Sequence, residues 1–378
     1  MQKRIKVVSV GIVLIVLFIS IIVLNNNTNN KHTFKKDGIL YALSLDGKSI
    51  TSFPSKGLYK ANVSCEGADG KWLYDDWKLA IENITGDVSC DIKFETITKT
   101  YFNDYITGLA GTTQGTGQVV NENGYRYEGK NPNNYVWFNN EYWRIIGVFD
   151  STSHGVSGKN LVKIVREDVL AGLTWNGLGN NNNWTKASLN LLLNGAYYNA
   201  QDGTSTEYCI GSSWTTSNCD YTKKGIQSNY RSMIANVTWY LGAHSSSSAT
   251  SDDFYGYERG TTVSSGRPTR TTGYVGLMYP SDYGYSVLSS SCARTIKINS
   301  YSSANCAGQS WMYGKGYEWT LTPYTSITSH AFCLSNYGIV FDVGVLYGYS
   351  TRPVLYLDAS VYKIDGEGTL DKPYIIGM

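Results

Sequence analysis

Charged residues are scarce in this chain of 378 residues. Asp, Glu, Lys and Arg together make up 16% of it and nearly cancel, to a formal net charge of +2. Beyond the basic residues that flank one apolar segment there is no basic run, whereas proteins that bind nucleic acid or acidic substrates concentrate positive charge on one face. We therefore expect no nucleic-acid partner and no acidic substrate.

The chain also lacks the short motifs of common metal, cofactor and catalytic sites. It has no Cys-x-x-Cys pair, no phosphate loop and no dinucleotide fingerprint. His154, His244 and His330 lie in polar or Ser-rich surroundings without a nucleophile elbow, so we interpret them as surface or structural residues. A triad assembled from distant positions stays open. We predict no metal, no cofactor and no identifiable catalytic residue.

One long apolar run stands near the start of the chain. Residues 7–24 contain no charge and no proline, and as a helix they would reach roughly 27 Å, close to the hydrocarbon core of a bilayer. A cleaved signal peptide needs a shorter run and small residues at its cleavage site. We therefore predict an uncleaved transmembrane signal anchor, with residues 1–6 cytoplasmic, residues 25–37 a polar stalk, and the remainder extracellular on a single-pass protein of the cell membrane.

The cysteines favour an oxidising compartment. Connectivity cannot be read from a sequence, but three local pairs suggest themselves: Cys65 with Cys90, Cys209 with Cys219, and Cys292 with Cys306. Disulfides would place the body of the protein outside the cytoplasm, an orientation that basic residues on both sides of the apolar run leave ambiguous. Cys333 is left over, and we interpret it as a small buried apolar side chain.

Abundant Tyr, Trp, Gly, Asn, Ser and Thr favour strands and turns over helical bundles, so the fold class is predicted as mainly β. Residues 38–96 predict a small β-sandwich module. Four segments alternate as strands do, at 39–43, 58–63, 77–81 and 88–94, with turn signals between them. A core of this size is marginal, and a Cys65–Cys90 bridge would stabilise it by about 3 kcal/mol.

Residues 97–124 predict a linker that consists of a short helix and a loop rich in Gly and Thr. Residues 125–378 predict an α+β domain. It opens on a hairpin, because strands flank Asn139 and Asn140, and a third strand follows at 161–166.

Two helices are expected in this domain, over 184–199 with Thr185 as N-cap and over 230–241. Residues 245–270 read as a polar loop. Short strands close the chain, at 274–278, 317–321, 339–343 and 352–357.

The small module resembles one that stands beside a signal anchor in uncharacterised surface proteins of Gram-positive gut bacteria. The resemblance rests on the segment 53–57, on Cys65 and Trp72, and on the segments 77–79 and 90–94. The larger region is similar to uncharacterised domains with three motifs: W-R-I-I-G at Trp143–Gly147, W-x-x-A-S-L-N at Trp184–Asn190, and R-P-V-L-Y-L at Arg352–Leu357.

The order of hairpin, helix, helix, long loop and terminal strands also resembles the C-type-lectin-like fold, which the formylglycine-generating enzymes share. Calcium-dependent lectins use Glu-Pro-Asn or Gln-Pro-Asp loops, and the nearest approach here, Asn131-Pro132-Asn133, lacks the acidic ligand. The copper site of the enzymes needs paired cysteines, and Cys333 has no evident partner. The resemblance thus implies a fold without either chemistry.

What remains is the chemistry of aromatic and amide-rich loops, which suit stacking on sugar rings or anchoring a partner protein. Most aromatics on strands are expected in the core. The candidate ligand-binding residues are Trp175, Trp184, Tyr255, Tyr257, Tyr279, Tyr283, Tyr285, Tyr347 and Tyr349. The leading hypothesis is a membrane-anchored extracellular binding or adhesion protein for a glycan or a surface protein. The alternatives are a cell-wall or glycan hydrolase, which needs two carboxylates about 5 to 9 Å apart, and a purely structural envelope protein.

Overall fold

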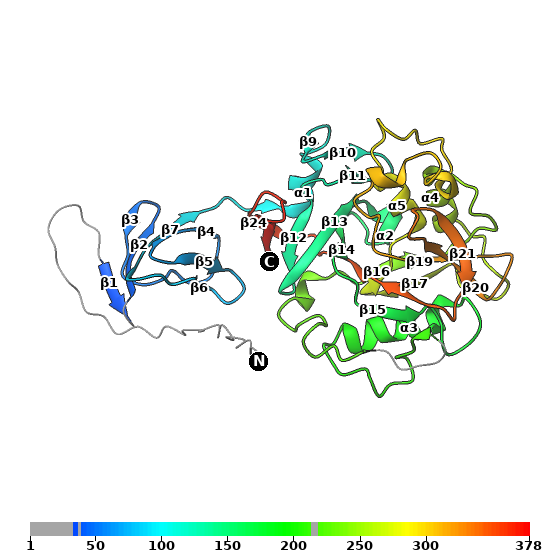
Figure 1. Cartoon of the computed structure of the whole chain (residues 1–378), viewed down its shortest axis with the longest axis horizontal. Helices are drawn as coiled ribbons and strands as arrows, with labels where there is room; N and C mark the ends of the chain where they lie inside the picture. Colours follow the sequence, from blue (N-terminus) through cyan, green and yellow to red (C-terminus); the bar gives the residue numbers. More distant parts are fainter. Residues whose placement is uncertain (1–32, 37–38, 213–217) are drawn as a thin grey trace, which may run out of the picture. The chain divides into compact units, whose positions relative to one another are not determined.

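A computed structural model describes residues 33–36, 39–212 and 218–378 of the chain. The fold is mainly β, as predicted. The chain divides after Lys99 into two compact units (Figure 1). No helix among the described residues is both long and apolar enough to cross a bilayer. The predicted cytoplasmic start, the anchor at 7–24 and the stalk as far as residue 32 lie outside the described residues.

The smaller unit contains a five-stranded sheet of order β1-β2-β7-β4, with β3 paired to β2, and a separate β5-β6 hairpin. β2 pairs with β7 in parallel, and β4 pairs with β7 antiparallel. β1, at the end of the predicted stalk, is therefore part of this sheet. The strands are β1 Thr33–Lys36, β2 Ile39–Leu45, β3 Lys48–Ser49, β4 Tyr59–Glu66, β5 Asp69–Leu73, β6 Lys78–Glu82 and β7 Val88–Thr96.

Aromatic rings fill the core of this unit between the sheet and the hairpin. Phe94 and Trp72 are buried and meet edge to face at 5.0 Å between ring centroids, and Phe53 meets Trp72 in the same way, also at 5.0 Å. Such pairs contribute beyond their buried area. Asp69-Gly70 was predicted as a turn, but these residues begin the strand β5, which supplies Trp72 to this core.

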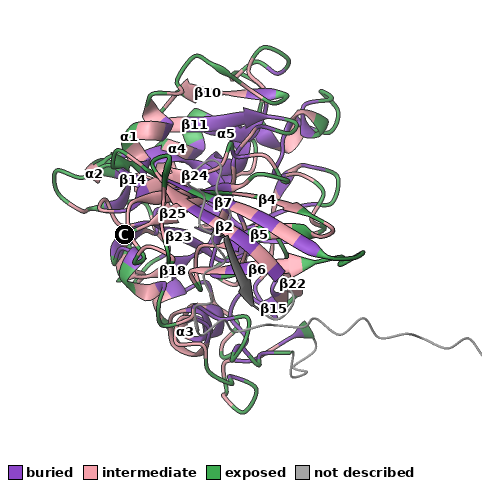
Figure 2. Ribbon diagram, turned by 90° about the vertical axis from the view of Figure 1, so that its left-hand side faces the viewer, coloured by how far each residue is buried: buried purple, intermediate pink, exposed green. Residues whose placement is uncertain are grey.

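The larger unit is built on an eleven-stranded sheet with the main order β18-β23-β14-β13-β12-β25-β24-β8; β11 pairs with β13 and connects β10 and β9. Figure 2 shows buried positions along strands such as β11, whereas exposed positions gather in loops. The strands are β8 Thr100–Tyr101, β9 Thr113–Gln114, β10 Gly117–Asn121, β11 Tyr125–Gly129, β12 Tyr135–Phe138, β13 Glu141–Phe149, β14 Leu161–Arg166, β18 Val275–Gly276, β23 Val354–Tyr356, β24 Tyr362–Asp365 and β25 Tyr374–Gly377.

A second sheet in this unit has the order β15-β22-β19-β20-β21, and β16 and β17 form a hairpin. These strands are β15 Ala171–Thr174, β16 Val237–Tyr240, β17 Arg270–Gly273, β19 Glu318–Pro323, β20 His330–Leu334, β21 Val340–Gly344 and β22 Gly348–Thr351. The helices are α1 Phe102–Thr107, α2 Ser151–His154, α3 Ser188–Leu192, α4 Ser251–Arg259 and α5 Pro280–Ser286. Shorter turns are η1 Trp184–Lys186, η2 Leu193–Tyr197, η4 Arg231–Met233, η5 Ile298–Ser300 and η6 Ala307–Gln309.

The predicted linker at 97–124 is wrong as a separate segment. α1 is present, but Phe102 and Ile106 are fully buried in the core of the larger unit. β9 and β10 belong to its main sheet, so this unit begins at Thr100 and not at Tyr125. A stretch rich in Gly and Thr was read as a loop because the partner strand β11 is not evident from composition.

The two helix predictions had different outcomes. Residues 184–186 (η1) and 188–197 (α3 and η2) are helical, but Ala187 between them is extended and is the N-cap of α3, not Thr185. The helix predicted over 230–241 is wrong: after the single turn η4 the chain forms β16, in which Val237 and Trp239 are buried and their neighbours are half-buried. The predicted polar loop 245–270 contains α4, whose capping box joins Thr250 and Asp253.

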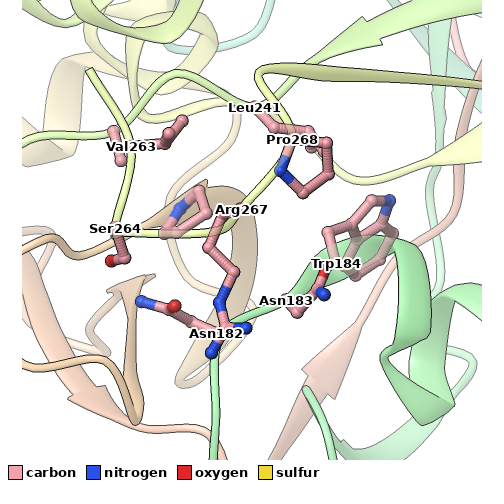
Figure 3. A pocket seen from close by; sticks show the side chains of 10 residues that line it. Asn182, Asn183, Trp184, Leu241, Val263, Ser264, Arg267 and Pro268 are labelled. Atoms are coloured by element: carbon pink, nitrogen blue, oxygen red, sulfur yellow. The ribbon is translucent and has the colours of Figure 1, made fainter. Parts of the chain in front are cut away.

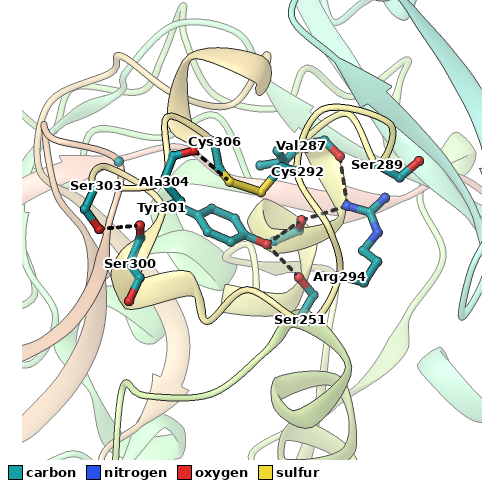
Figure 4. Close-up of a disulfide and its surroundings, with 12 residues drawn as sticks. Ser251, Val287, Ser289, Cys292, Arg294, Ser300, Tyr301, Ser303, Ala304 and Cys306 are labelled. Atoms are coloured by element: carbon teal, nitrogen blue, oxygen red, sulfur yellow. Dashed lines mark hydrogen bonds between the residues drawn. A yellow bond between two sulfur atoms is a disulfide. The ribbon is translucent and has the colours of Figure 1, made fainter.

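Disulfides join Cys65 to Cys90, Cys209 to Cys219 and Cys292 to Cys306, the three local pairs that the sequence suggested. Cys333 is a free, buried thiol, and burial raises its pKa well above the usual value. Figure 4 shows the third bond, next to which the Tyr301 hydroxyl contacts Ser251 Oγ of α4 at 3.0 Å and donates to the Gly284 carbonyl of α5 at 3.2 Å. This disulfide loop therefore packs against both helices.

His154, at the end of α2, gives the larger unit a predictable response to acid. Its ring is buried; Nε2 lies 3.0 Å from the Phe149 carbonyl, and Nδ1 accepts from the Val156 N–H at 3.2 Å. The neutral tautomer with a proton on Nε2 satisfies both contacts, and burial lowers the pKa of this histidine. Protonation of Nδ1 would remove the second contact.

Because the unfolded chain binds this proton more readily, the unfolding free energy should fall as the pH drops below about 6.5. Denaturant titrations should show that the unfolding free energy falls more between pH 7.5 and pH 5 in the wild type than in His154→Gln. Equal losses in the two proteins would contradict the assignment.

Candidate functional site

Five of the predicted ligand-binding aromatics are buried, so their assignment to a binding surface is wrong. They make internal contacts: the Trp175 and Trp184 rings lie 5.0 Å apart, and the Tyr279 and Tyr283 hydroxyls donate to backbone carbonyls. Glycine and asparagine nearby made these segments read as loops, but the loops fold inward over the core. The buried five are Trp175, Trp184, Tyr279, Tyr283 and Tyr285.

Tyr255 and Tyr257 are half-buried on α4 and also face internal partners. The Tyr257 ring stacks on His244 at 3.8 Å. The Arg259 guanidinium lies 3.6 Å from the Tyr255 ring centroid, and the Tyr255 hydroxyl contacts Ser153 at 2.9 Å. Neither ring is as exposed as that of Tyr347, one of the two remaining candidates.

Tyr347 and Tyr349 lie in an aromatic strip at the surface of the second sheet, together with Tyr317 and Phe341. The Tyr349 ring is nearly parallel to Tyr317 at 5.2 Å and to Tyr347 at 5.8 Å, and Phe341 meets Tyr317 edge to face at 6.0 Å. Tyr347 is 56% exposed, and the other three are half-buried. Sequence reasoning found two of these residues and missed Tyr317 and Phe341.

Strand pairing places the aromatic strip. Phe341 on β21 is paired with Cys333 on β20, which in turn faces Trp319 on β19. The buried Trp319 ring lies 5.1 Å from Tyr349 and supports the strip from below. The turn between β21 and β22, closed by the Tyr347 N–H to the Gly344 carbonyl at 3.2 Å, carries the exposed ring.

A polar pair lies close to Tyr347, the exposed end of the strip. His330 Nδ1 lies 2.8 Å from Asp342 Oδ2, and both side chains are about a quarter exposed. A Cβ placed on Gly344 would meet both the Tyr347 ring, at 3.5 Å, and His330 Nε2, at 4.0 Å, so the imidazole and the phenol flank the same spot. Exposed rings next to a hydrogen-bonding pair suit a ligand with apolar faces and hydroxyl edges.

A polar pocket lies at the other end of β19, where the loops at 182–184, 241–243 and 263–268 meet Pro323 (Figure 3). Its free space is small, with room for about one water molecule, and part of it is open to solvent. Asn182, Trp184 and Ser264 are at most 5% exposed. Four buried atoms that line the pocket have no hydrogen-bond partner among the described residues: Asn182 Oδ1, Trp184 Nε1, Ser264 Oγ and Arg267 Nε.

The orientation of Asn182 is fixed because its Nδ2 donates to the Tyr324 carbonyl at 2.7 Å and to the His330 carbonyl at 2.8 Å. Its Oδ1 is left as an acceptor, while Trp184 and Arg267 offer N–H donors. The space suits one water-sized polar group. Only the tertiary structure brings these residues together; Trp184 was a sequence candidate, but as part of an exposed aromatic surface.

Comparisons with known proteins do not extend these observations. We found no family model, curated protein or solved structure that matches the chain. Within the part of the chain that the structure describes, no group of three or more His, Cys, Asp and Glu side chains is arranged to hold a metal ion. The aromatic strip is therefore the feature of this protein that best indicates a function.

Proposed function

We propose that this chain is a membrane-anchored extracellular binding protein and that its aromatic strip binds a glycan. The observation that carries the proposal is the exposure of Tyr347 at the end of a row of nearly parallel rings. Flat rings can stack on the apolar face of a sugar, and the neighbouring His330 and Asp342 can bond to its hydroxyls. A surface protein is the other ligand class that such a strip would suit.

The extracellular location is part of the same proposal. The apolar run at 7–24 would supply a single span, and the three disulfides favour an oxidising compartment. The C-type-lectin-like fold also stays a proposal: the hairpin β12-β13, helix α3 and the strands at the end of the chain support it, whereas the second expected helix is replaced by the strand β16.

Replacing Tyr347 with alanine should weaken binding about 30-fold, because truncating a central aromatic contact costs on the order of 2 kcal/mol. The measurement is a titration of the full chain with hits from a screen of glycans, cell-wall polymers and surface proteins. Tyr337, which is 62% exposed and makes no ring contact among the described residues, offers the matched control Tyr337→Ala.

Equal losses of binding affinity in Tyr347→Ala and Tyr337→Ala would contradict a role for the aromatic strip. A hit that is cleaved would favour the hydrolase alternative, and the absence of any ligand would favour the structural one.

A further inference from the structure

A buried charge cluster in the larger unit (Lys163, Asp282, Glu258, Arg126 and Arg259) plays no part in the proposed binding site. At its centre Lys163 of β14 and Asp282 of α5, 119 positions apart in the sequence, place Nζ and Oδ2 2.5 Å from each other. Neither side chain has any exposed surface. An amine and a carboxyl group are thus held together where bulk water does not reach.

Aromatic rings enclose the amine of Lys163. Its Nζ lies 4.4 Å from the Tyr279 ring centroid and 5.6 to 5.7 Å from those of Phe149, Trp239 and Tyr356. Burial lowers the pKa of this lysine to about 8, although the charge of Asp282 opposes the shift. On the order of a tenth of the amine is therefore unprotonated and nucleophilic at pH 7.

The two oxygens of Asp282 have different partners. Oδ1 accepts from Arg126 Nη1 at 3.1 Å, and Oδ2 accepts from the Tyr279 N–H at 2.9 Å as well as from Lys163. Arg126 is therefore placed to stabilise negative charge on Oδ1.

A second buried carboxyl group, Glu258, contacts Ser281, the residue before Asp282. Its two oxygens accept hydrogen bonds from Ser281, from the backbone N–H at 2.9 Å and from the hydroxyl at 2.5 Å. Burial, assisted by the charge of Asp282 and opposed by Arg259, raises the pKa of Glu258 to about 7. This carboxyl can both accept and release a proton near neutrality.

We propose that Lys163 and Asp282 condense into an intramolecular isopeptide bond, with Glu258 as the group that moves the proton. Glu258 takes one proton from the Lys163 ammonium, the free Nζ attacks Cγ of Asp282, and Arg126 stabilises the charge that develops on Oδ1. Glu258 carries protons from the nitrogen to Oδ2, the Cγ–Oδ2 bond breaks, and water leaves. An ammonium and a carboxylate give an amide and one water, so atoms and charge balance without a co-reactant.

The environment favours this outcome in two ways. Burial of an ion pair carries a desolvation penalty, and the amide removes both charges. The fold also holds the reacting groups together, which converts a bimolecular reaction into an intramolecular one. Arg126 keeps its bonds to the carbonyls of Glu122 and Asn123 and its stacking on Phe149, so it does not depend on Asp282 alone.

Mass spectrometry of the full chain tests the proposal. After denaturation and reduction, tryptic digestion should yield one branched peptide that joins the segments around residues 163 and 282, about 18 Da lighter than the sum of its parts, the mass of one water. Lys163→Met and Asp282→Ala should lack this species whether or not they fold. Glu258→Gln, which keeps both reacting groups, should lose it or accumulate it much more slowly.

The matched control is Lys315→Met. Lys315 Nζ lies 2.7 Å from Glu167 Oε1, but the two side chains are 27% and 19% exposed, so water reaches the pair. This variant should keep the branched peptide. Separate, unmodified peptides from the wild type would show an ion pair only and overturn the proposal. A bond that forms at the wild-type rate in Glu258→Gln would overturn the role of Glu258.

Discussion

Replacing Glu318 with alanine is expected to lower the unfolding free energy of the larger unit by about 3 to 5 kcal/mol, because it leaves a buried cation without its partner. Arg352 Nε and Nη2 donate to the two oxygens of Glu318 at 2.8 and 2.9 Å, and the side chains are 0% and 1% exposed. Burial raises the pKa of Glu318, and Arg352 counteracts this shift.

The position of this pair explains why its loss should affect the whole unit. Glu318 begins β19 in the second sheet, whereas Arg352 lies between β22 of that sheet and β23 of the main sheet. The ion pair therefore fixes the point where the chain passes from one sheet to the other.

Chemical denaturation followed by intrinsic fluorescence measures this effect. The double variant Glu318→Leu with Arg352→Met should be close to the wild type, since apolar pairs of similar volume can replace buried ion pairs. Glu367→Ala, which breaks the pair with Lys372 in which both side chains are about two-thirds exposed, should cost less than about 1 kcal/mol. A loss for Glu318→Ala as small as that of Glu367→Ala would contradict the prediction.

Removing the Cys65–Cys90 disulfide should cost the smaller unit about 3 to 4 kcal/mol, because the bond closes a loop of 25 positions and restricts the unfolded chain. The two cysteines face each other directly on β4 and β7. A core this small supplies little more stability than that amount. We therefore expect the Cys65→Ala, Cys90→Ala variant to have a largely unfolded smaller unit at 37 °C.

Limited proteolysis with mass analysis of the fragments measures this loss. Cleavage should concentrate in residues 39–99, while the larger unit stays resistant. The matched control is Cys209→Ala with Cys219→Ala, which opens a loop of 10 positions in the larger unit and should leave the smaller unit resistant. Resistance of the smaller unit without its own disulfide would show that its core suffices.

Local signals in the sequence were sufficient for several elements of the fold. Asn139 and Asn140 both adopt positive φ, at 58° and 59°, as a two-residue hairpin requires, and β14 spans the predicted Leu161–Arg166. The helix predicted at 230–241 was wrong because Trp239 has a strand partner in β17, 32 positions from it, that no local pattern reveals. α4 was missed although the capping box at Thr250 and Asp253 was a readable signal.

The candidate site residues also differ in how far local sequence could predict them. Tyr347 could be proposed from composition alone, but Tyr283 belongs to an equally aromatic segment and is fully buried. Local sequence does not state which face of a loop meets solvent, because that depends on the elements that pack over it.

The sequence by itself determined a mainly β chain with a long apolar run at 7–24, cysteines spaced so that three local pairs suggest themselves, and a chemistry of aromatic side chains, since these depend on composition and near neighbours. Only the tertiary structure decided which rings form the aromatic strip. It also decided that Lys163 and Asp282, 119 positions apart, meet in a fully buried site lined by aromatic rings. Contacts at such separations follow from sheet order and helix packing, which no short window of sequence contains.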